Sequence, residues 1–332
     1  MATVTPSELP SLVADTGYPV LEEAYDRQPQ FFPLMGEVKG VNEADTVAPF
    51  LGHRELINPG MQRHQEIEVG QEAPGGNVFE GYTVYTKFRK YSRRMEIPRE
   101  MLEASNGRAQ VISMIQKAAQ SWGAIAPIIK DEYAAGILQK GTLTAGSAKY
   151  FDGSFAGNAD PNPTVIYNGL PFFDTAHTIT GASSTYANHT VSRALTADNL
   201  DTTLTTMRVT NAIDERAERI LNEPNLLMVP VALEGTARRI IDSELLPGSG
   251  NNDVNWLRGR VSVLANPYLT DDTDAWWLGH SMRGLQFFDS GMPVLETEYD
   301  ARKQVAVVTS TFYFGGSVND WRPWYCCNKA AS

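Results

Sequence analysis

The sequence of 332 residues contains only two cysteines, which are adjacent at Cys326 and Cys327. A disulfide framework needs cysteines that pair across separate parts of the chain, so this usage excludes a small disulfide-stapled secreted fold. Adjacent cysteines rarely reach disulfide geometry without strain, which argues against a redox couple. We expect a buried, inert pair.

Long apolar runs are also missing. No stretch approaches the roughly 18 consecutive apolar residues that a membrane-spanning helix needs. Residues 1–18 contain prolines and acidic side chains where a signal peptide needs a basic start and an apolar run. We therefore expect a protein that is made in the cytoplasm and has no membrane partner.

Positive charge is scarce. Lys and Arg number 28 against 39 Asp and Glu, a net charge of −11, and a polyanion binder needs the opposite balance. The exception is residues 87–99, which hold a basic cluster of Lys87, Arg89, Lys90, Arg93, Arg94 and Arg99. The cluster fits a solvated strand face, ion pairing with acidic neighbours or, third, nucleic-acid contact.

Catalytic and metal-binding motifs are absent as well. The histidines are His53, His64, His177, His189 and His280. None forms the i, i+4 pair of a zinc protease, and there is no Cys-x-x-Cys, phosphate loop or nucleophile elbow. Asp174 with His177 could belong to a hydrolase, and residues 271–274 could bind calcium. The default explanations are instead a hydrogen-bonded loop histidine and an acidic surface turn, because no nucleophile elbow and no EF-hand glycine or distal glutamate accompany them. We predict no enzyme activity, catalytic residue, cofactor or metal.

What the sequence has is enough apolar material, 42%, for a real core, and a length that suggests about two compact units. Residues 1–57 carry prolines too often for a regular packed element, which predicts a weakly structured arm. The arm nevertheless contains Phe31, Phe32 and other apolar side chains. It therefore needs a surface to lie on, either its own core or a neighbouring subunit.

A β-hairpin is expected next. Residues 66–69 alternate polar and apolar, 73–77 are dense in turn residues, and 82–91 are rich in aromatic and β-branched side chains. A two-stranded ribbon alone is marginally stable in water, so it should rest on something else.

A single long helix should follow. Apolar residues recur at steps of three and four, which predicts a helix over 108–139 with one apolar stripe; they are Val111, Ile115, Ala118, Trp122, Ile125, Ile129, Tyr133 and Ile137. Gly123 and Pro127 predict a bend near its middle, and Gly141 a stop.

The remainder combines loops, helices and strands. Residues 141–195 are loop-like, Thr196 can cap a helix, and 226–231 form a short apolar run typical of a buried strand. A second helix is expected at 233–245, with strands near 260–265, 275–279, 284–288, 293–299 and 304–314. Helices and strands alternate without a regular βαβ order, so the predicted fold class is α+β.

The order of arm, hairpin, long helix, α+β region and closing strands resembles the major capsid proteins of tailed bacteriophages. Residues 169–177, Gly-Leu-Pro-Phe-Phe-Asp-Thr-Ala-His, look like the Gly-x-Pro-Leu-Phe-x-Thr-x-His segment of the Mu-like major head subunit group. Residues 226–238 are similar to that group's apolar strand, proline and Ala-Leu-Glu-x-Thr-Ala-Arg helix start.

The resemblance implies the tailed-phage capsid fold and a structural function. The implied parts are an N-terminal arm at 1–57, an extended loop at 58–95, a peripheral domain at 96–195 with the spine helix, an axial domain at 196–288, and closing strands of the peripheral domain at 289–332. The chain is then a major capsid protein that self-assembles into an icosahedral shell around the phage genome. The alternatives are a phage tail or sheath subunit and the hydrolase.

The implied partners are the chain itself, in hexamers and pentamers, a portal protein at one vertex, and packaged DNA through weak non-specific contact. No long charged helical segment precedes the arm, so a separate scaffolding protein is expected. Residues 61–81 contain no lysine, which argues against cross-linking through a lysine there. Virion localisation and assembly in a bacterial cytoplasm follow. The candidate subunit-interface residues are Phe31, Phe32, Ile67, Val69, Tyr82, Val84, Arg89, Arg93 and Arg94.

Overall fold

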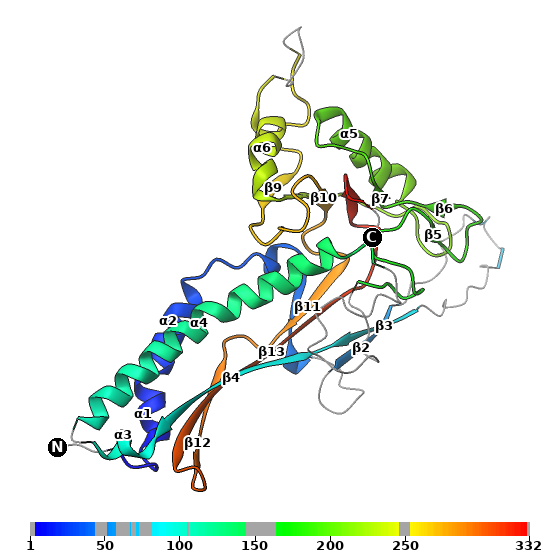
Figure 1. Cartoon of the computed structure of the whole chain (residues 1–332). Coiled ribbons are helices and arrows are strands. Elements are labelled where there is room, and N and C mark those ends of the chain that lie inside the picture. The colour runs from blue at the N-terminus through cyan, green and yellow to red at the C-terminus, as the bar shows by residue number, and fades with distance from the viewer. Residues whose placement is uncertain are drawn as a thin grey trace. The chain divides into compact units, whose positions relative to one another are not determined.

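The computed structural model describes residues 4–43, 52–57, 67, 71–72, 82–104, 106–143, 164–245 and 253–330. The chain divides into two compact units, each assembled from three separate stretches of sequence. The first comprises residues 1–44, 87–135 and 287–316, and the second comprises 45–86, 136–286 and 317–332. Each unit contains its own apolar core. Helices and sheets mix in both, as the predicted α+β class requires (Figure 1).

The longest element is helix α4, Gly107–Gln139, which confirms the helix predicted over 108–139. It follows the short helix α3, Arg99–Glu103, and contains Pro127. The predicted apolar stripe is only partly correct. Val111 and Ile115 of the stripe are buried, but Ile125 is 46% exposed and its neighbour Ala126 is buried in its place. The bend near Pro127 stays a prediction.

The first part of the N-terminal arm is helical, so the prediction of a weakly structured arm is wrong for residues 9–26. It forms α1, Leu9–Thr16, α2, Tyr18–Asp26, and 3-10 turns at Phe32–Leu34 and Val41–Glu43. Pro10, Pro19 and Pro33 each occupy the first turn of one of these helices. A first-turn residue has no intrahelical acceptor for its N–H, so proline costs nothing there.

The arm lies on the core of its own unit. Leu9, Leu12 and Leu21 share one cluster with Val111 and Ile115 of α4. The sequence left two surfaces open for the arm, its own core or a neighbouring subunit. Residues 4–35 lie on the core of their own chain.

The sheet of the first unit has the order β1-β11-β13-β12, with β4 paired to β13. The strands are β1 Glu37–Gly40, β4 Arg89–Pro98, β11 Leu285–Asp289, β12 Val294–Asp300 and β13 Val305–Val318. Both β12 and β4 run antiparallel to β13. Leu295, Ala306 and Val308 from these strands enter the cluster around α4. The closing strands thus pack on the long helix.

The predicted return strand over 82–91 is two strands. β3, Tyr82–Lys87, pairs with β2, Gly52–Ile57, while β4 joins the sheet of the first unit. The expected partner strand at 66–69 is described only at Ile67, which lies in no strand, and the turn at 73–77 lies outside the described residues.

The second unit is built on a sheet of order β7-β14-β10-β8-β9. Its strands are β7 His189–Thr190, β8 Leu226–Val229, β9 Ser262–Ala265, β10 Trp276–Gly279 and β14 Tyr325–Cys327. A small pair, β5 His177–Thr178 and β6 Thr185–Tyr186, lies apart from that sheet. The strands predicted near 226, 262, 276, 285, 294 and 305 are all confirmed.

Two helices pack against the core of this unit. α5, Ala197–Thr205, begins at the predicted cap, where the Thr196 side chain accepts the Asn199 N–H, and it continues as a π-helical turn at Thr206–Thr210. α6, Glu234–Asp242, buries Ala237, Ile240 and Ile241. It ends three residues before the predicted boundary at 245, and Leu245 is 49% exposed. No helix among the described residues is long and apolar enough to cross a membrane.

Candidate assembly sites

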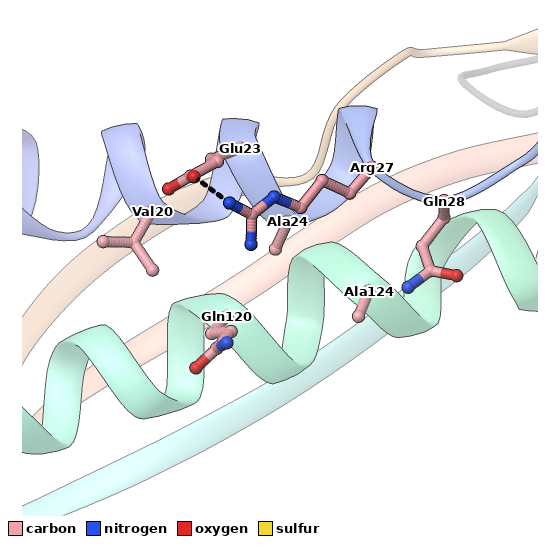
Figure 2. Close-up of a pocket in the computed structure, with 7 residues that line it drawn as sticks. All are labelled: Val20, Glu23, Ala24, Arg27, Gln28, Gln120 and Ala124. Atoms are coloured by element: carbon pink, nitrogen blue, oxygen red, sulfur yellow. Dashed lines mark hydrogen bonds and ion pairs between the residues drawn. The ribbon is translucent and has the colours of Figure 1, made fainter.

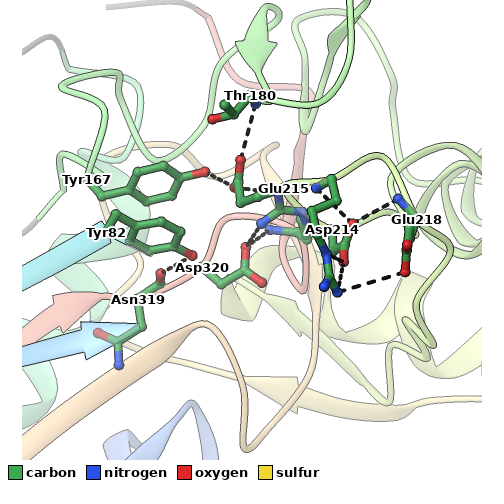
Figure 3. Close-up of polar contacts among 10 residues, drawn as sticks. Tyr82, Tyr167, Thr180, Asp214, Glu215, Glu218, Asn319 and Asp320 are labelled. Carbon is green, nitrogen blue, oxygen red and sulfur yellow. Dashed lines mark hydrogen bonds and ion pairs between the residues drawn. The ribbon is translucent and has the colours of Figure 1, made fainter. Parts of the chain in front are cut away.

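The β2–β3 ribbon begins at a polar cluster of the second unit (Figure 3). Tyr82, the first residue of β3, stacks on Tyr167 with ring centroids 3.3 Å apart, and its hydroxyl donates to the Asn319 carbonyl at 3.4 Å. Tyr167 donates its hydroxyl to Glu215. Burial raises the pKa of both phenols, and nearby Asp320 and Glu215 raise them further. Both tyrosines therefore stay neutral hydrogen-bond donors.

The centre of the cluster is a buried ion pair. Arg322 lies 2.6 Å from Glu215 and 3.0 Å from Asp320, and the Arg322 and Glu215 side chains are 4% and 6% exposed. Burial by itself would lower the pKa of Arg322, but Asp320 and Glu215 outweigh it and raise the pKa. A buried pair like this is strongly destabilising when one partner is removed, by about 3–5 kcal/mol. It therefore holds the base of the ribbon in one position.

A second network fixes the arm within the first unit. The Lys130 side chain is fully buried in α4, and its ammonium lies 2.6 Å from Asp289, 2.7 Å from the Tyr25 hydroxyl and 2.8 Å from the Gly291 carbonyl. Burial lowers the pKa of Lys130, and the adjacent Asp289 opposes that shift. One lysine thus joins α2, α4 and the turn after β11.

The neighbouring Asp131 holds the next part of the arm. Its Oδ1 accepts the backbone N–H groups of Phe31 at 2.9 Å and Phe32 at 2.8 Å. Burial raises the pKa of Asp131 to about 6, against the effect of these two hydrogen bonds. The Phe32 ring then packs edge-on against Phe314 at 5.1 Å. Phe32 is 1% exposed, so it is a core residue and leaves the set of interface candidates.

A groove of about 200 Å³ lies between α2 and α4 (Figure 2). It is lined by Val20, Glu23, Ala24, Arg27, Gln28, Gln120 and Ala124. Ligand pockets usually measure about 300–1,000 Å³, so this groove is small for a ligand site. It marks where the two helices cross.

The other interface candidates separate into buried and exposed residues. Val84 and Arg89 are 7% and 9% exposed, so they are inside their own units, and Arg89 lies over the Tyr133 ring at 6.0 Å. Phe31 and Tyr82 are half-buried, and Val69 lies outside the described residues. The candidates that remain on the surface are Ile67, Arg93 and Arg94. Arg94 pairs with Glu96 at 3.1 Å, so β4 presents a solvated, charged face.

His177 is a packed core residue. It is fully buried, its Nε2 is 2.9 Å from the Asn188 side-chain oxygen, and its ring stacks on Trp321 at 4.2 Å. Burial lowers the pKa of His177 to about 4. The Asp174 carboxylate accepts the Ala176 N–H instead of orienting the imidazole. These contacts give His177 a structural role.

Metal ligands are not assembled in the described part of the chain, where no three His, Cys, Asp or Glu side chains gather. In the acidic turn at 271–274, Asp271 pairs with Lys140 at 2.6 Å and Asp272 accepts the Asp274 N–H. Cys326 and Cys327 are buried and free, and burial raises the pKa of both thiols. This agrees with the inert pair expected from the sequence.

Comparison with known proteins identifies the family. The profile of a phage capsid protein family matches residues 81–327, about three quarters of the chain. This chain belongs to the phage capsid proteins. No curated protein matches the sequence.

The capsid protein also resembles solved structures. The capsid of an empty GTA particle is 12% identical with a TM-score of 0.49, covering 96% of this chain and 98% of that one. A chain from the structure of Mycobacterium phage Patience is 12% identical with a TM-score of 0.48, and the match covers 100% of this chain and 91% of that one. A chain of an encapsulin complex from Synechococcus elongatus is 13% identical with a TM-score of 0.45, and the match covers 92% of this chain and 89% of that one. The role as a structural capsid protein rests on the family match.

A capsid protein acts through its surfaces, and the second unit exposes several large apolar side chains. Leu245 and Val254 face each other in a β-bridge, with Trp256 two residues further on. Val209, Ile220, Leu221 and Met282 are also exposed. All seven are between 39% and 79% exposed.

Sequence reasoning missed both buried networks. The adjacent charges Lys130 and Asp131 interrupt the apolar stretch of α4, and that interruption was the available signal. Glu215 and Arg322 are separated by 107 positions, and no local pattern links them.

Proposed function

We propose that this capsid protein is the major subunit of a closed icosahedral shell and assembles with copies of itself into hexamers and pentamers. The observation that carries the proposal is the family match over residues 81–327. Its function on this proposal is structural and not enzymatic, and the buried His177, whose pKa is lowered, is not placed to act as a general base. The protein is then a component of the virion.

The finer parts of the proposal concern partners. A separate scaffolding protein directs assembly in the bacterial cytoplasm, and a portal occupies one vertex. Packaged DNA meets the chain only through weak non-specific contact, because a net charge of −11 repels phosphates. We retain the arm, extended loop, peripheral and axial assignments as proposals, with the arm now helical in its first part.

Electron microscopy of the purified protein, with and without its scaffolding protein, tests the proposal directly. Closed polyhedral shells support it. Tubes or helical stacks favour the tail or sheath alternative and overturn it, as do persistent monomers at high concentration under both conditions.

Arg93 and Arg94 are proposed to pair with acidic surfaces of a neighbour and to set the register between subunits. Both are exposed on β4, which pairs with β13 along one edge. We expect Arg93→Glu with Arg94→Glu to abolish shells while the monomer keeps its circular dichroism spectrum. The matched control is Arg302→Glu with Lys303→Glu, two exposed charges on the β12–β13 turn of the same sheet. Normal shells from the first variant would refute the register role.

A further inference from the structure

Strand β12 forms one edge of the sheet in the first unit. It is the last strand in the order β1-β11-β13-β12, and within the described residues its only neighbouring strand is β13. An edge strand presents a row of unpaired N–H and C=O groups, which readily pairs with a strand of another molecule. How this edge is closed therefore bears on how the subunit stays apart from other copies.

Tyr18, the first residue of α2, closes the edge at Leu295. The Leu295 N–H donates to the Tyr18 hydroxyl oxygen at 2.9 Å, and the same hydroxyl donates to the Leu295 carbonyl at 3.1 Å. One side chain thus satisfies both backbone groups of one residue, as a residue of a facing strand would. Because Tyr18 belongs to the arm, this closure exists only while the arm lies on its own unit.

The two hydrogen bonds also show which backbone groups face outward further along β12. In an antiparallel pair, residues whose N–H and C=O point to the partner strand alternate with residues whose groups point away from it. Leu295 lies opposite Ser310 with its groups turned away from β13, so Thr297 and Tyr299 are turned away as well. Within the described residues, no hydrogen bond is found for the outward groups of these two. The edge of β12 is therefore closed at Leu295 and open beyond it.

The charge on the strand gives a different kind of protection. Glu296 and Glu298 are exposed on β12. Like charges on facing strands destabilise their pairing, so two β12 strands repel each other. This repulsion acts against a second β12 strand, whereas the hydroxyl of Tyr18 blocks any strand at Leu295.

We propose that Tyr18 is an edge guard: while the arm is docked, its hydroxyl keeps β12 from adding a strand of a second copy. The proposal concerns association through a strand edge and does not depend on the proposed shell.

Tyr133 offers a comparison within the same unit. Its hydroxyl donates to the Gly316 carbonyl at 3.2 Å and accepts the Gly316 N–H at 3.3 Å. Gly316 is buried, so there the same chemistry stabilises the interior of the unit and closes no exposed edge.

Removing one hydroxyl tests the guard. Tyr18→Phe leaves the Leu295 N–H and C=O unpaired, and it should lower the concentration at which the protein associates by at least about tenfold. Sedimentation velocity measures this without scaffolding protein, below the concentration at which the unmodified protein assembles. The matched control, Tyr133→Phe, should lower monomer stability without changing association. Equal association of both variants, or a Tyr18→Phe protein as monomeric as the unmodified one, overturns the proposal.

A proline identifies the edge through which the variant associates. The Thr297 N–H points away from β13, so Thr297→Pro removes an outward donor without removing a bond to β13. Circular dichroism establishes that the variants fold. Tyr18→Phe combined with Thr297→Pro should associate no more than the unmodified protein. Association that persists in the double variant rules out β12 as the edge.

Amide hydrogen exchange in the unmodified protein gives a readout that needs no variant. The Leu295 amide should exchange at least about tenfold more slowly than the amides of Thr297 and Tyr299, because only the first has a hydrogen-bond acceptor. Equal exchange at the three positions would show that the Tyr18 hydroxyl does not close the edge.

Discussion

Two buried basic side chains of this protein are matched by acidic partners from distant parts of the chain. Arg322 meets Glu215, and Lys130 meets Asp289, each at 2.6 Å. Removing a partner would leave an uncompensated buried charge, so these pairs specify one arrangement more than they add net stability. His177 differs because it is buried in its neutral form.

The neutral His177 predicts a pH dependence of stability. Its folded pKa of about 4 lies below the ordinary 6.5, so the unfolded chain takes up the proton first as the pH falls. The stabilisation is complete above pH 6.5 and is lost as the pH falls towards and below 4, by up to about 3 kcal/mol in total. We expect the free energy of unfolding of His177→Phe to fall less steeply than that of the unmodified protein between pH 7 and pH 5, as measured by urea unfolding. His280→Gln, at a half-buried site, should change the slope less; equal slopes in all three proteins would contradict the assignment.

Between elements, the crossing of α2 and α4 decides whether the arm stays on its own unit. Gly123 of α4 faces the backbone of α2 there, and a Cβ at this position would lie 2.4 Å from the Leu21 carbonyl oxygen and 3.0 Å from the Ala24 Cβ. The contact requires glycine because of close approach, near the groove of Figure 2. Lys130 and Asp131 hold the arm further along.

Gly123→Ala should therefore loosen the arm. Alanine favours a helix by about 1 kcal/mol, but overpacking a tight contact costs about 1–3 kcal/mol, so we expect a net loss of stability. Limited proteolysis should cleave the arm faster, and urea unfolding should show the loss. Gly235→Ala in α6 is the matched control, because a Cβ there meets nothing within 4 Å and the variant should be neutral or slightly more stable. A stabilised Gly123→Ala would show that the helices can separate freely.

For the whole molecule, assembly should depend on a few exposed side chains held on a rigid base. Trp256 is 56% exposed beside Leu245 and Val254. Its neighbour Asn255 is buried and donates its side-chain amide to the Ile240 and Ser243 carbonyls at 2.6 and 3.0 Å. A rigidly presented tryptophan is a typical interface hot spot, often contributing about 2 kcal/mol or more.

Trp256→Ala should raise the protein concentration needed for shell formation by at least about tenfold, without changing monomer stability. Light scattering over a concentration series measures the threshold. Val294→Ala, an exposed apolar residue on β12, is the control and should leave it unchanged. An unaltered threshold for Trp256→Ala would remove this residue from the interface.

Local patterns in the sequence were sufficient for most elements. The recurrence of apolar residues located α4, Thr196 marked the start of α5, and the apolar run at 226–229 is a buried strand. Proline counts misled for the arm, because position within a helix matters more than frequency. The succession of elements and two short motifs also indicated the capsid family.

The sequence by itself determined most of the elements, their order and the family, because periodicity, capping and turn chemistry act between near neighbours in the chain. Tertiary structure decided which surfaces remain exposed. It placed Phe32 and Val84 inside, left Ile125 outside, and joined Glu215 to Arg322 across 107 positions. Burial and pairing depend on contacts between distant segments, and only the folded chain brings those segments together.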